Sequence, residues 1–153
     1  MTILSLKSHG SVTRKFYAEH GLYRKRKDVV IMENKTVIAI LFGGCSTEYE
    51  VSLQSAYSVI SHIRQEKYQV HLIGITREGT WLYYQGDLDR IPADTWASAD
   101  CFPAMISPNR TDHGLYLMRG GEIELIRLDA VFPILHGKNG EDGTVQGLLE
   151  LAG

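Results

Sequence analysis

The sequence predicts an α/β domain: an open parallel sheet with flanking helices and an inserted β-hairpin. Two apolar runs of strand length, 36–42 and 129–137, are nearly continuous, which is typical of parallel strands covered on both faces. Between the first of these runs and a further strand at 68–76 lies an apolar stripe with helical spacing. Residues 114–128 form two alternating runs around a pair of glycines, the pattern of a hairpin.

The first unit of this plan is a strand, a helix and a strand. The run TVIAILF at 36–42 ends at two glycines, and Thr47 and Glu50 follow with the spacing of a capping box, in which each side chain bonds an amide at the start of the helix. YQVHLIGIT at 68–76 then completes a βαβ unit. The helix is expected to bury one stripe, formed by Leu53, Ala56, Ile60 and Ile63.

The later elements are less regular. TREGTWLYY at 76–84 predicts a glycine turn into a short aromatic strand, whereas 87–110, with three prolines, predicts a loop. The hairpin at 114–128 is expected to be an insertion outside the core. DAVFPILHG at 129–137 predicts another buried strand. DGTVQGLLELAG at 142–153 predicts a helix that Asp142 caps, with Val145, Leu148 and Leu149 facing inward.

Composition restricts the class of protein. A chain of 153 residues with 44% hydrophobic and 22% charged residues can build an ordinary globular core. Cys45 and Cys101 are far apart and lack the spacing of a zinc site or a disulfide framework. No apolar run reaches the ~20 residues that span a bilayer. We therefore expect a soluble protein of the cytoplasm, without a metal site in this stretch and without a membrane partner.

The first 31 residues differ in charge from the remainder. They carry seven basic and two acidic residues, which leaves nine basic and sixteen acidic residues for 32–153. A small basic cluster, YRKRKD at 23–28, is compatible with an arm that binds nucleic acid or an anionic surface, but it has no interleaved aromatics. We expect 1–31 to be a basic leader that is poorly ordered or upstream of the natural start, with no nucleic-acid partner, and 32–153 to be the folded domain.

Polar residues gather after two of the expected strands. GGCSTEYE follows the first strand, and HGKNGEDG at 136–143 follows the last one. Ligands of open parallel sheets bind beyond the carboxyl ends of the strands, so both loops are expected at one crevice. The first loop lacks a phosphate-binding motif, and Glu48 would repel a phosphate. Two interpretations of Glu48 stay open: it binds a cationic group such as an ammonium, or it stabilises the helix N-terminus.

Two other residue types in these loops could carry chemistry. A thiol near a helix N-terminus can become a nucleophile, which would assign that role to Cys45 with His136 as its base, although a packing role is more common. In the second loop, His136 and Glu141 could pair, which would fix the orientation of the imidazole.

The two blocks together resemble a known family. VIAILFGGCSTEYEVSLQSA is similar to the opening of D-alanine–D-alanine and D-alanine–D-serine ligases, and VFPILHGKNGEDGTVQGLLELAG is similar to their second signature, with GITREGTW between them. The resemblance covers residues 35–153. It implies a Rossmann-like N-terminal substrate domain that precedes an ATP-grasp region, in an enzyme that forms a dipeptide for peptidoglycan through an acyl phosphate.

The resemblance also implies roles for single residues. Glu48 would hold the ammonium of the first D-alanine, Val51 would lie near that substrate, and His136, braced by Glu141, would line the same subsite. ATP and Mg²⁺ would bind to the ATP-grasp part, which this stretch lacks, so the chain is expected to be a truncated, inactive domain of a ligase. Family members are commonly homodimers. The alternative is a non-catalytic α/β module that binds a small ligand through its glycine-rich loops.

Overall fold

The computed structural model describes residues 23–26, 29–32, 35–98 and 100–153. The chain divides into two units, Met1–Lys35 and Thr36–Gly153, and each is described by itself. In the first unit, strands β1 (Tyr23–Arg26) and β2 (Val29–Met32) pair antiparallel. The rest of the predicted basic leader lies outside the described residues, so its order and its relation to the natural start stay predictions.

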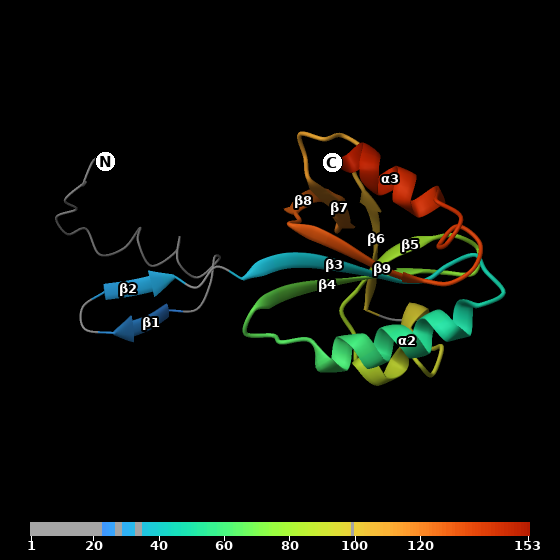
Figure 1. Ribbon diagram of the computed structural model, residues 1–153, viewed down its shortest axis with the longest axis horizontal. Helices are drawn as coiled ribbons and strands as arrows, with labels where there is room; N and C mark the ends of the chain where they lie inside the picture. Colours follow the sequence, from blue (N-terminus) through green and yellow to red (C-terminus); the bar gives the residue numbers. More distant parts are fainter. Residues whose placement is uncertain (1–22, 27–28, 33–34, 99) are drawn as a thin grey trace. The chain divides into compact units, whose positions relative to one another are not determined.

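The second unit is built on a seven-stranded mixed sheet with the order β8-β7-β6-β5-β4-β3-β9 (Figure 1). Only β4, β3 and β9 are mutually parallel, while the remaining neighbours run antiparallel. The strands are β3 (Thr36–Gly43), β4 (Tyr68–Ile75), β5 (Trp81–Tyr84), β6 (Cys101–Ile106), β7 (Gly114–Arg119), β8 (Glu122–Arg127) and β9 (Ala130–Leu135). The α/β class is confirmed, and the parallel part of the sheet is three strands wide.

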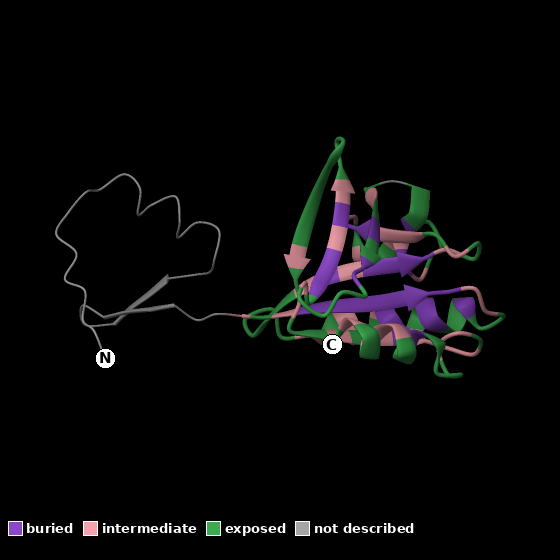
Figure 2. Ribbon diagram, turned by 90° about the horizontal axis from the view of Figure 1, so that it is seen from above, coloured by how far each residue is buried: buried purple, intermediate pink, exposed green. Residues whose placement is uncertain are grey.

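Two helices cover opposite faces of this sheet (Figure 1). Helix α2 (Tyr49–His62) packs Leu53 and Ala56 on Ile40 and Phe42 of β3, together with Trp96 from a short 3-10 segment. The opposite cluster joins Ala39 and Leu41 of β3 to Val145 of helix α3 (Thr144–Ala152). The strand β3 is therefore buried on both faces (Figure 2), which explains its continuous apolar run.

The stripe predicted for the first helix is confirmed, because Leu53 and Ala56 are buried and Ile60 and Ile63 pack against the same cluster. The inward side of α3 is also as predicted: Val145 is buried, and Leu148 and Leu149 pack on its cluster. No helix in the described ranges is both long and apolar enough to cross a bilayer.

The hairpin belongs to the sheet, so its expected place outside the core was wrong. Its turn is as predicted, since Gly120 and Gly121 both have positive φ and Arg119 is opposite Glu122. Leu115 and Leu117 of β7 are, however, buried in the same cluster as α3. The outer strand β8 is mostly exposed, so the hairpin forms one end of the sheet.

Two other expectations about strands were wrong. The range 87–110, expected as a loop, contains β6, which pairs with β5 through residues 101–103 and with β7 through residues 104–106. Pro103 lies at this change of partner, where a missing amide is tolerated. The strand β9 is an edge strand, not a buried one: Phe132 is 50% exposed, and Pro133 occupies a position that an edge permits.

Candidate functional site

The loop between β3 and α2 begins with two glycines whose conformations the turn requires. Gly43 and Gly44 have φ of +85° and +103°, a region that favours glycine. A Cβ on Gly43 would lie 2.2 Å from the carbonyl oxygen of Ile75 in β4. The chain can therefore cross close over the end of β4, with the Gly44 amide donating to the Ile75 carbonyl at 2.8 Å. This turn carries Ser46 and Glu48 to the start of α2.

The predicted capping box is absent from this helix start, because Glu48 is the N-cap residue and its side chain makes no capping hydrogen bond. The Glu48 amide donates a hydrogen bond to Ser46 Oγ at 3.1 Å. Thr47, the expected partner of Glu50, is exposed. The Glu48 side chain is thus exposed and available to a ligand, while its main chain is tied into the turn.

Arg77, which sequence reasoning did not single out, holds the first turn of α2. Its guanidinium donates to Glu50 Oε1 at 2.7 Å and to Asp94 Oδ2 at 3.1 Å, and it lies 4.0 Å from the centre of the Tyr49 ring. The hydrogen bond from Arg77 lowers the pKa of Glu50 below its ordinary value. Arg77 is two residues beyond the end of β4, so the rule that ligands and polar loops lie at the carboxyl ends of parallel strands could have found it.

Tyr49 anchors the same turn inside the protein. Its ring is 2% exposed, and its hydroxyl accepts a hydrogen bond from Trp96 Nε1 at 3.0 Å. Burial raises the pKa of Tyr49 to about 12, so the phenol stays neutral at physiological pH. The residue next to Glu48 is therefore fixed by packing and by a buried hydrogen bond.

The second loop, between β9 and α3, places His136 beside α2. His136 Nδ1 lies 3.7 Å from Glu141 Oε1, and its Nε2 lies 3.2 Å from Ser55 Oγ. Ser55 was missed in the sequence, although it is seven residues after Glu48 and four after Val51, a spacing that places the three on one side of a helix. The side chain of His136 is 31% exposed and that of Glu141 is 61% exposed, so the pair lies at the surface.

Asp142 organises the end of this loop. Its two carboxylate oxygens accept hydrogen bonds from the amides of Asn139 and Thr144, each at 3.0 Å. These bonds, the one from Asn139 first, lower the pKa of Asp142. The predicted contribution of Asp142 to the start of α3 is present as the bond to Thr144, while the N-cap residue itself is Gly143 in a left-handed conformation.

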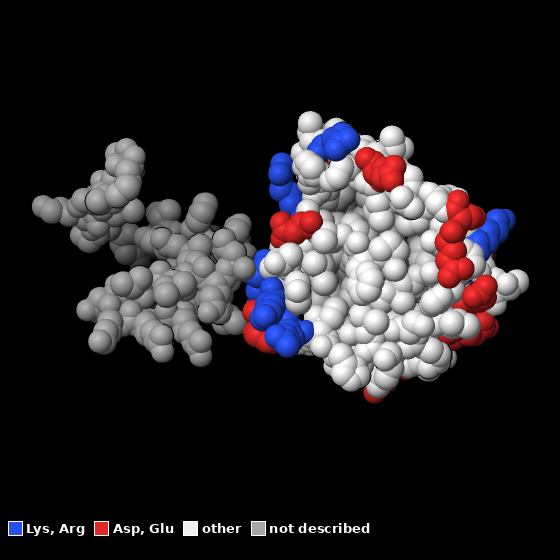
Figure 3. All heavy atoms as spheres, viewed as in Figure 1, with Lys and Arg blue, Asp and Glu red and all other residues white. Residues whose placement is uncertain are grey.

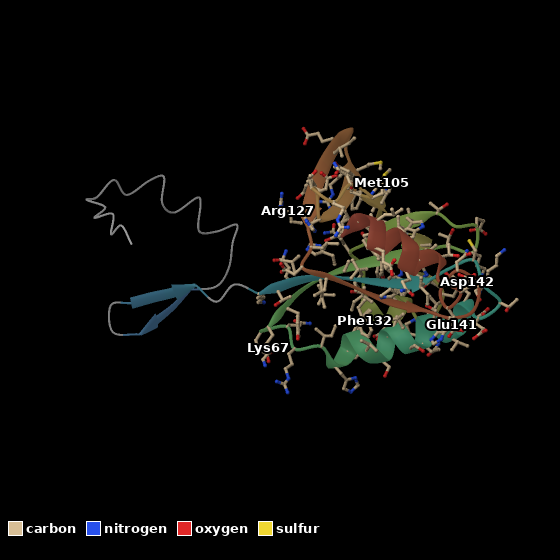
Figure 4. All side chains as sticks on the ribbon, turned by 45° about the horizontal axis from the view of Figure 1, so that its top comes forward. Lys67, Met105, Arg127, Phe132, Glu141 and Asp142 are labelled. Carbon is tan, nitrogen blue, oxygen red and sulfur yellow. The ribbon has the colours of Figure 1, made fainter. Side chains whose placement is uncertain are left out.

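The two loops meet at Gly137, the residue after His136. A Cβ built there would lie 2.6 Å from Ser46 Oγ and 2.9 Å from Glu48 Oε1, so the backbone of the second loop contacts the side chains of the first. Val51, on the first turn of α2, is 50% exposed. Several acidic side chains lie along the right-hand side of the unit Thr36–Gly153 in Figure 3, the side on which Figure 4 places Glu141 and Asp142. A carboxylate, a hydroxyl and an imidazole in the loops at the carboxyl ends of β3 and β9 suit a ligand with an ammonium group.

Cys45 belongs to a different feature, a cavity of about 230 Å³ on the α3 side of the sheet. Its Sγ lies 3.9 Å from the Thr76 carbonyl oxygen. Lys138 and Trp81 also line this cavity, whereas the four residues predicted to bind substrate do not. His136 contacts Ser55 and Glu141 instead of the thiol, so the geometry offers no support for a Cys45–His136 nucleophile. Within the described ranges, no three His, Cys, Asp or Glu side chains gather as metal ligands.

Comparison with known proteins adds an independent observation. Residues 37–153 match the family described as the D-ala D-ala ligase N-terminus. The chain is 48% identical over 120 residues to the vancomycin B-type resistance protein VanB of Enterococcus faecalis, covering 78% of this chain and 33% of that protein. It is 50% identical over 120 residues to a D-alanine–D-alanine ligase of Caldicellulosiruptor bescii, covering 78% and 32%.

Solved structures give the same result. The VanG D-Ala:D-Ser ligase from Enterococcus faecalis superposes with a TM-score of 0.73 at 46% identity, covering 78% of this chain and 34% of that one. The D-alanine–D-alanine ligase from Coxiella burnetii superposes with a TM-score of 0.64 at 32% identity, covering 77% and 34%. The chain therefore spans about a third of the length of the relatives that it matches.

Proposed function

The chain belongs to the D-alanine–D-alanine ligase family, whose N-terminal domain it matches, and from this premise we propose that it is the domain that binds the first substrate of a D-amino acid ligase. The carboxylate of Glu48 holds the ammonium group of D-alanine. Val51 lies near that substrate, and His136, oriented by Glu141, lines the same subsite. One observation carries the proposal: the Glu48 carboxylate and the backbone of the His136 loop approach each other at Gly137.

The proposed reaction of the full enzyme is that of the ligase family. ATP transfers its terminal phosphoryl group to the carboxylate of the first D-alanine, and the amine of a second D-alanine or D-serine then displaces the phosphate to form the dipeptide. ATP and Mg²⁺ bind to an ATP-grasp region outside this domain. The domain contributes the position of the first substrate, so by itself it forms no dipeptide. The dipeptide serves peptidoglycan synthesis in the cytoplasm.

The test of Glu48 uses the domain joined to its ATP-grasp region, with phosphate release from ATP measured against D-alanine concentration. Glu48→Gln removes the charge but keeps the shape of the side chain. Hydrogen bonds to charged groups contribute about 1.5–3 kcal/mol, so we expect kcat/KM to fall roughly 10- to 150-fold. Glu50→Gln is the matched control, because it makes the same change in the first turn of α2, at a carboxylate that bonds to Arg77. Equal activity in Glu48→Gln and wild type would refute the role of Glu48.

Assembly into a homodimer is part of the same proposal. The edge strand β9 has Phe132 half exposed beside unpaired main-chain groups on one side, and edges of this kind favour pairing with another chain. Sedimentation of the chain at several concentrations measures this directly. A Phe132→Lys variant should remain monomeric where the wild type associates, and a wild type that is monomeric throughout would contradict the dimer.

A further inference from the structure

Ser52 lies between the two loops of the proposed site and is fully buried. It is in the first turn of α2, and its exposed fraction is 0%. Its hydroxyl accepts a hydrogen bond from the Gly43 amide at 2.8 Å and donates one to the Ile134 carbonyl oxygen. One lone pair and the proton of this hydroxyl are therefore used by backbone groups of two different strands.

The strand register shows where in the sheet the two hydrogen bonds of Ser52 lie. Gly43 is the last residue of β3 and is opposite Leu135 of β9, the residue after Ile134. The Gly43 amide and the Ile134 carbonyl belong to neighbouring parallel strands, and the hydroxyl of Ser52 from α2 bonds to both of them. The helix, β3 and β9 are thus joined at one buried point, at the position where both strands end.

Each strand turns into a site loop directly after this point. Beyond Gly43 the chain leads to Glu48, and beyond Leu135 it leads to His136. The amide of Ser52 also donates to the Glu48 carbonyl oxygen at 3.1 Å. One residue therefore contacts the backbone of Glu48, the strand end before the first loop and the strand end before the second.

We propose that Ser52 is the positioning residue of the substrate subsite: its hydroxyl sets the spacing of the Glu48 and His136 loops. The chemical part of this statement rests on the proposed function, since it assumes that the two loops bind D-alanine. The side chain suits the task because a hydroxyl donates and accepts at once. Alanine at this position would remove both of these buried hydrogen bonds at once.

The structural test uses the chain itself and amide NMR. Ser52→Ala removes the hydroxyl, and Ser58→Ala removes an exposed hydroxyl from the same helix as a matched control. In Ser52→Ala we expect the amide resonances of both loops, 43–48 and 134–141, to shift, and the exchange of the Gly43 amide with solvent to accelerate by roughly tenfold or more. Ser58→Ala should leave both loops at their wild-type positions.

Wild-type chemical shifts in both loops of Ser52→Ala, with unchanged exchange at Gly43, would overturn the proposal. If Ser52→Ala does not fold, the wild type supplies the decision: a protected Ser52 hydroxyl proton with a nuclear Overhauser effect to the Gly43 amide supports the bridge, and the lack of that effect overturns it. Ser52→Thr keeps the hydroxyl, so a folded Ser52→Thr chain should restore the slow exchange at Gly43.

The functional test uses the domain joined to its ATP-grasp region. A displaced subsite should raise KM for D-alanine by about tenfold or more and leave KM for ATP unchanged, whereas a general loss of folded enzyme would lower kcat with both KM values constant. The second pattern would overturn a positioning role. If the wild-type enzyme forms no dipeptide, the proposed function fails, while the NMR result still decides whether Ser52 spaces the loops.

Discussion

Gly137 offers the sharpest test of the way in which the two loops meet, because alanine there inserts a methyl group between them without removing any polar group. Gly137 has φ of +67°, and its Cβ would lie 2.6 Å from Ser46 Oγ and 2.9 Å from Glu48 Oε1. Ordinary contacts of a Cβ begin near 3.4 Å. The two oxygens must therefore retreat by about 0.8 Å and 0.5 Å, the differences between that contact limit and these distances.

Gly137→Ala should weaken the binding of D-alanine more than it lowers the free energy of unfolding. An L-residue in the left-handed region costs roughly 1–2 kcal/mol. The overlap itself adds little to this, because both oxygens are at the ends of side chains that can rotate away. A displaced Glu48 carboxylate, in contrast, no longer meets the ammonium of the substrate in the geometry of the wild type. A shift of this size in a positioning group can reduce the rate by up to about 100-fold.

Gly120→Ala is the matched control. Gly120 has φ of +60°, and a Cβ there would meet nothing within 4 Å, so this variant carries the same backbone strain without the contact. We expect both variants to lose a similar free energy of unfolding in urea. In the enzyme that contains the ATP-grasp region, only Gly137→Ala should show a raised KM for D-alanine, measured by phosphate release.

Two results would refute the reasoning. Unchanged KM for D-alanine in Gly137→Ala would mean that Glu48 does not act at the junction of the loops. An equal rise of KM in Gly120→Ala would mean that the effect is a general consequence of strain and not of the contact between Gly137 and Glu48.

Three further predictions concern the scaffold. Burial lowers the pKa of His71 below its ordinary 6.5, so the unfolded chain binds more protons than the folded one, and the free energy of unfolding should decrease as the pH falls below about 6.5. In urea unfolding, His71→Gln should lose this pH dependence of stability. The same pH slope in His71→Gln and wild type would contradict the prediction. Gly74→Ala would place a Cβ 2.2 Å from the buried Trp96 ring, with an expected loss of about 1–3 kcal/mol, whereas Gly147→Ala, with open space around it, should retain full stability. Arg77→Gln should raise the pKa of Glu50, which Arg77 holds below its ordinary value, and an NMR titration that shows the same midpoint in both proteins would disprove this link.

Local sequence patterns predicted correctly those features whose structure depends on residues close together in the chain. The apolar run of β3, the stripe of α2 and the glycine pair of the hairpin each follow from periodicity or from a backbone conformation that few residues adopt. The convergence of the Glu48 and His136 loops was also predictable, because the carboxyl ends of adjacent parallel strands share one edge.

Errors arose where a partner distant in the sequence decided the outcome. Glu50 has the spacing of a capping residue, yet Arg77, 27 residues later, takes its carboxylate. Pro103 suggested a loop, but it lies where β6 exchanges one neighbouring strand for another. The run in β9 looked like a buried strand, and only the order of the sheet shows that it is at an edge.

The sequence by itself determined the α/β class, the family and the two loops in which Glu48 and His136 lie, since these depend on residue type and on spacing along the chain. The tertiary structure decided what holds those loops in place: the bridge from Ser52 to two strands, the guanidinium of Arg77 and the close approach at Gly137. Hydrogen bonds and steric contacts act through space over a few ångströms, so residues as far apart as Ser52 and Ile134 become neighbours only when the sheet has formed.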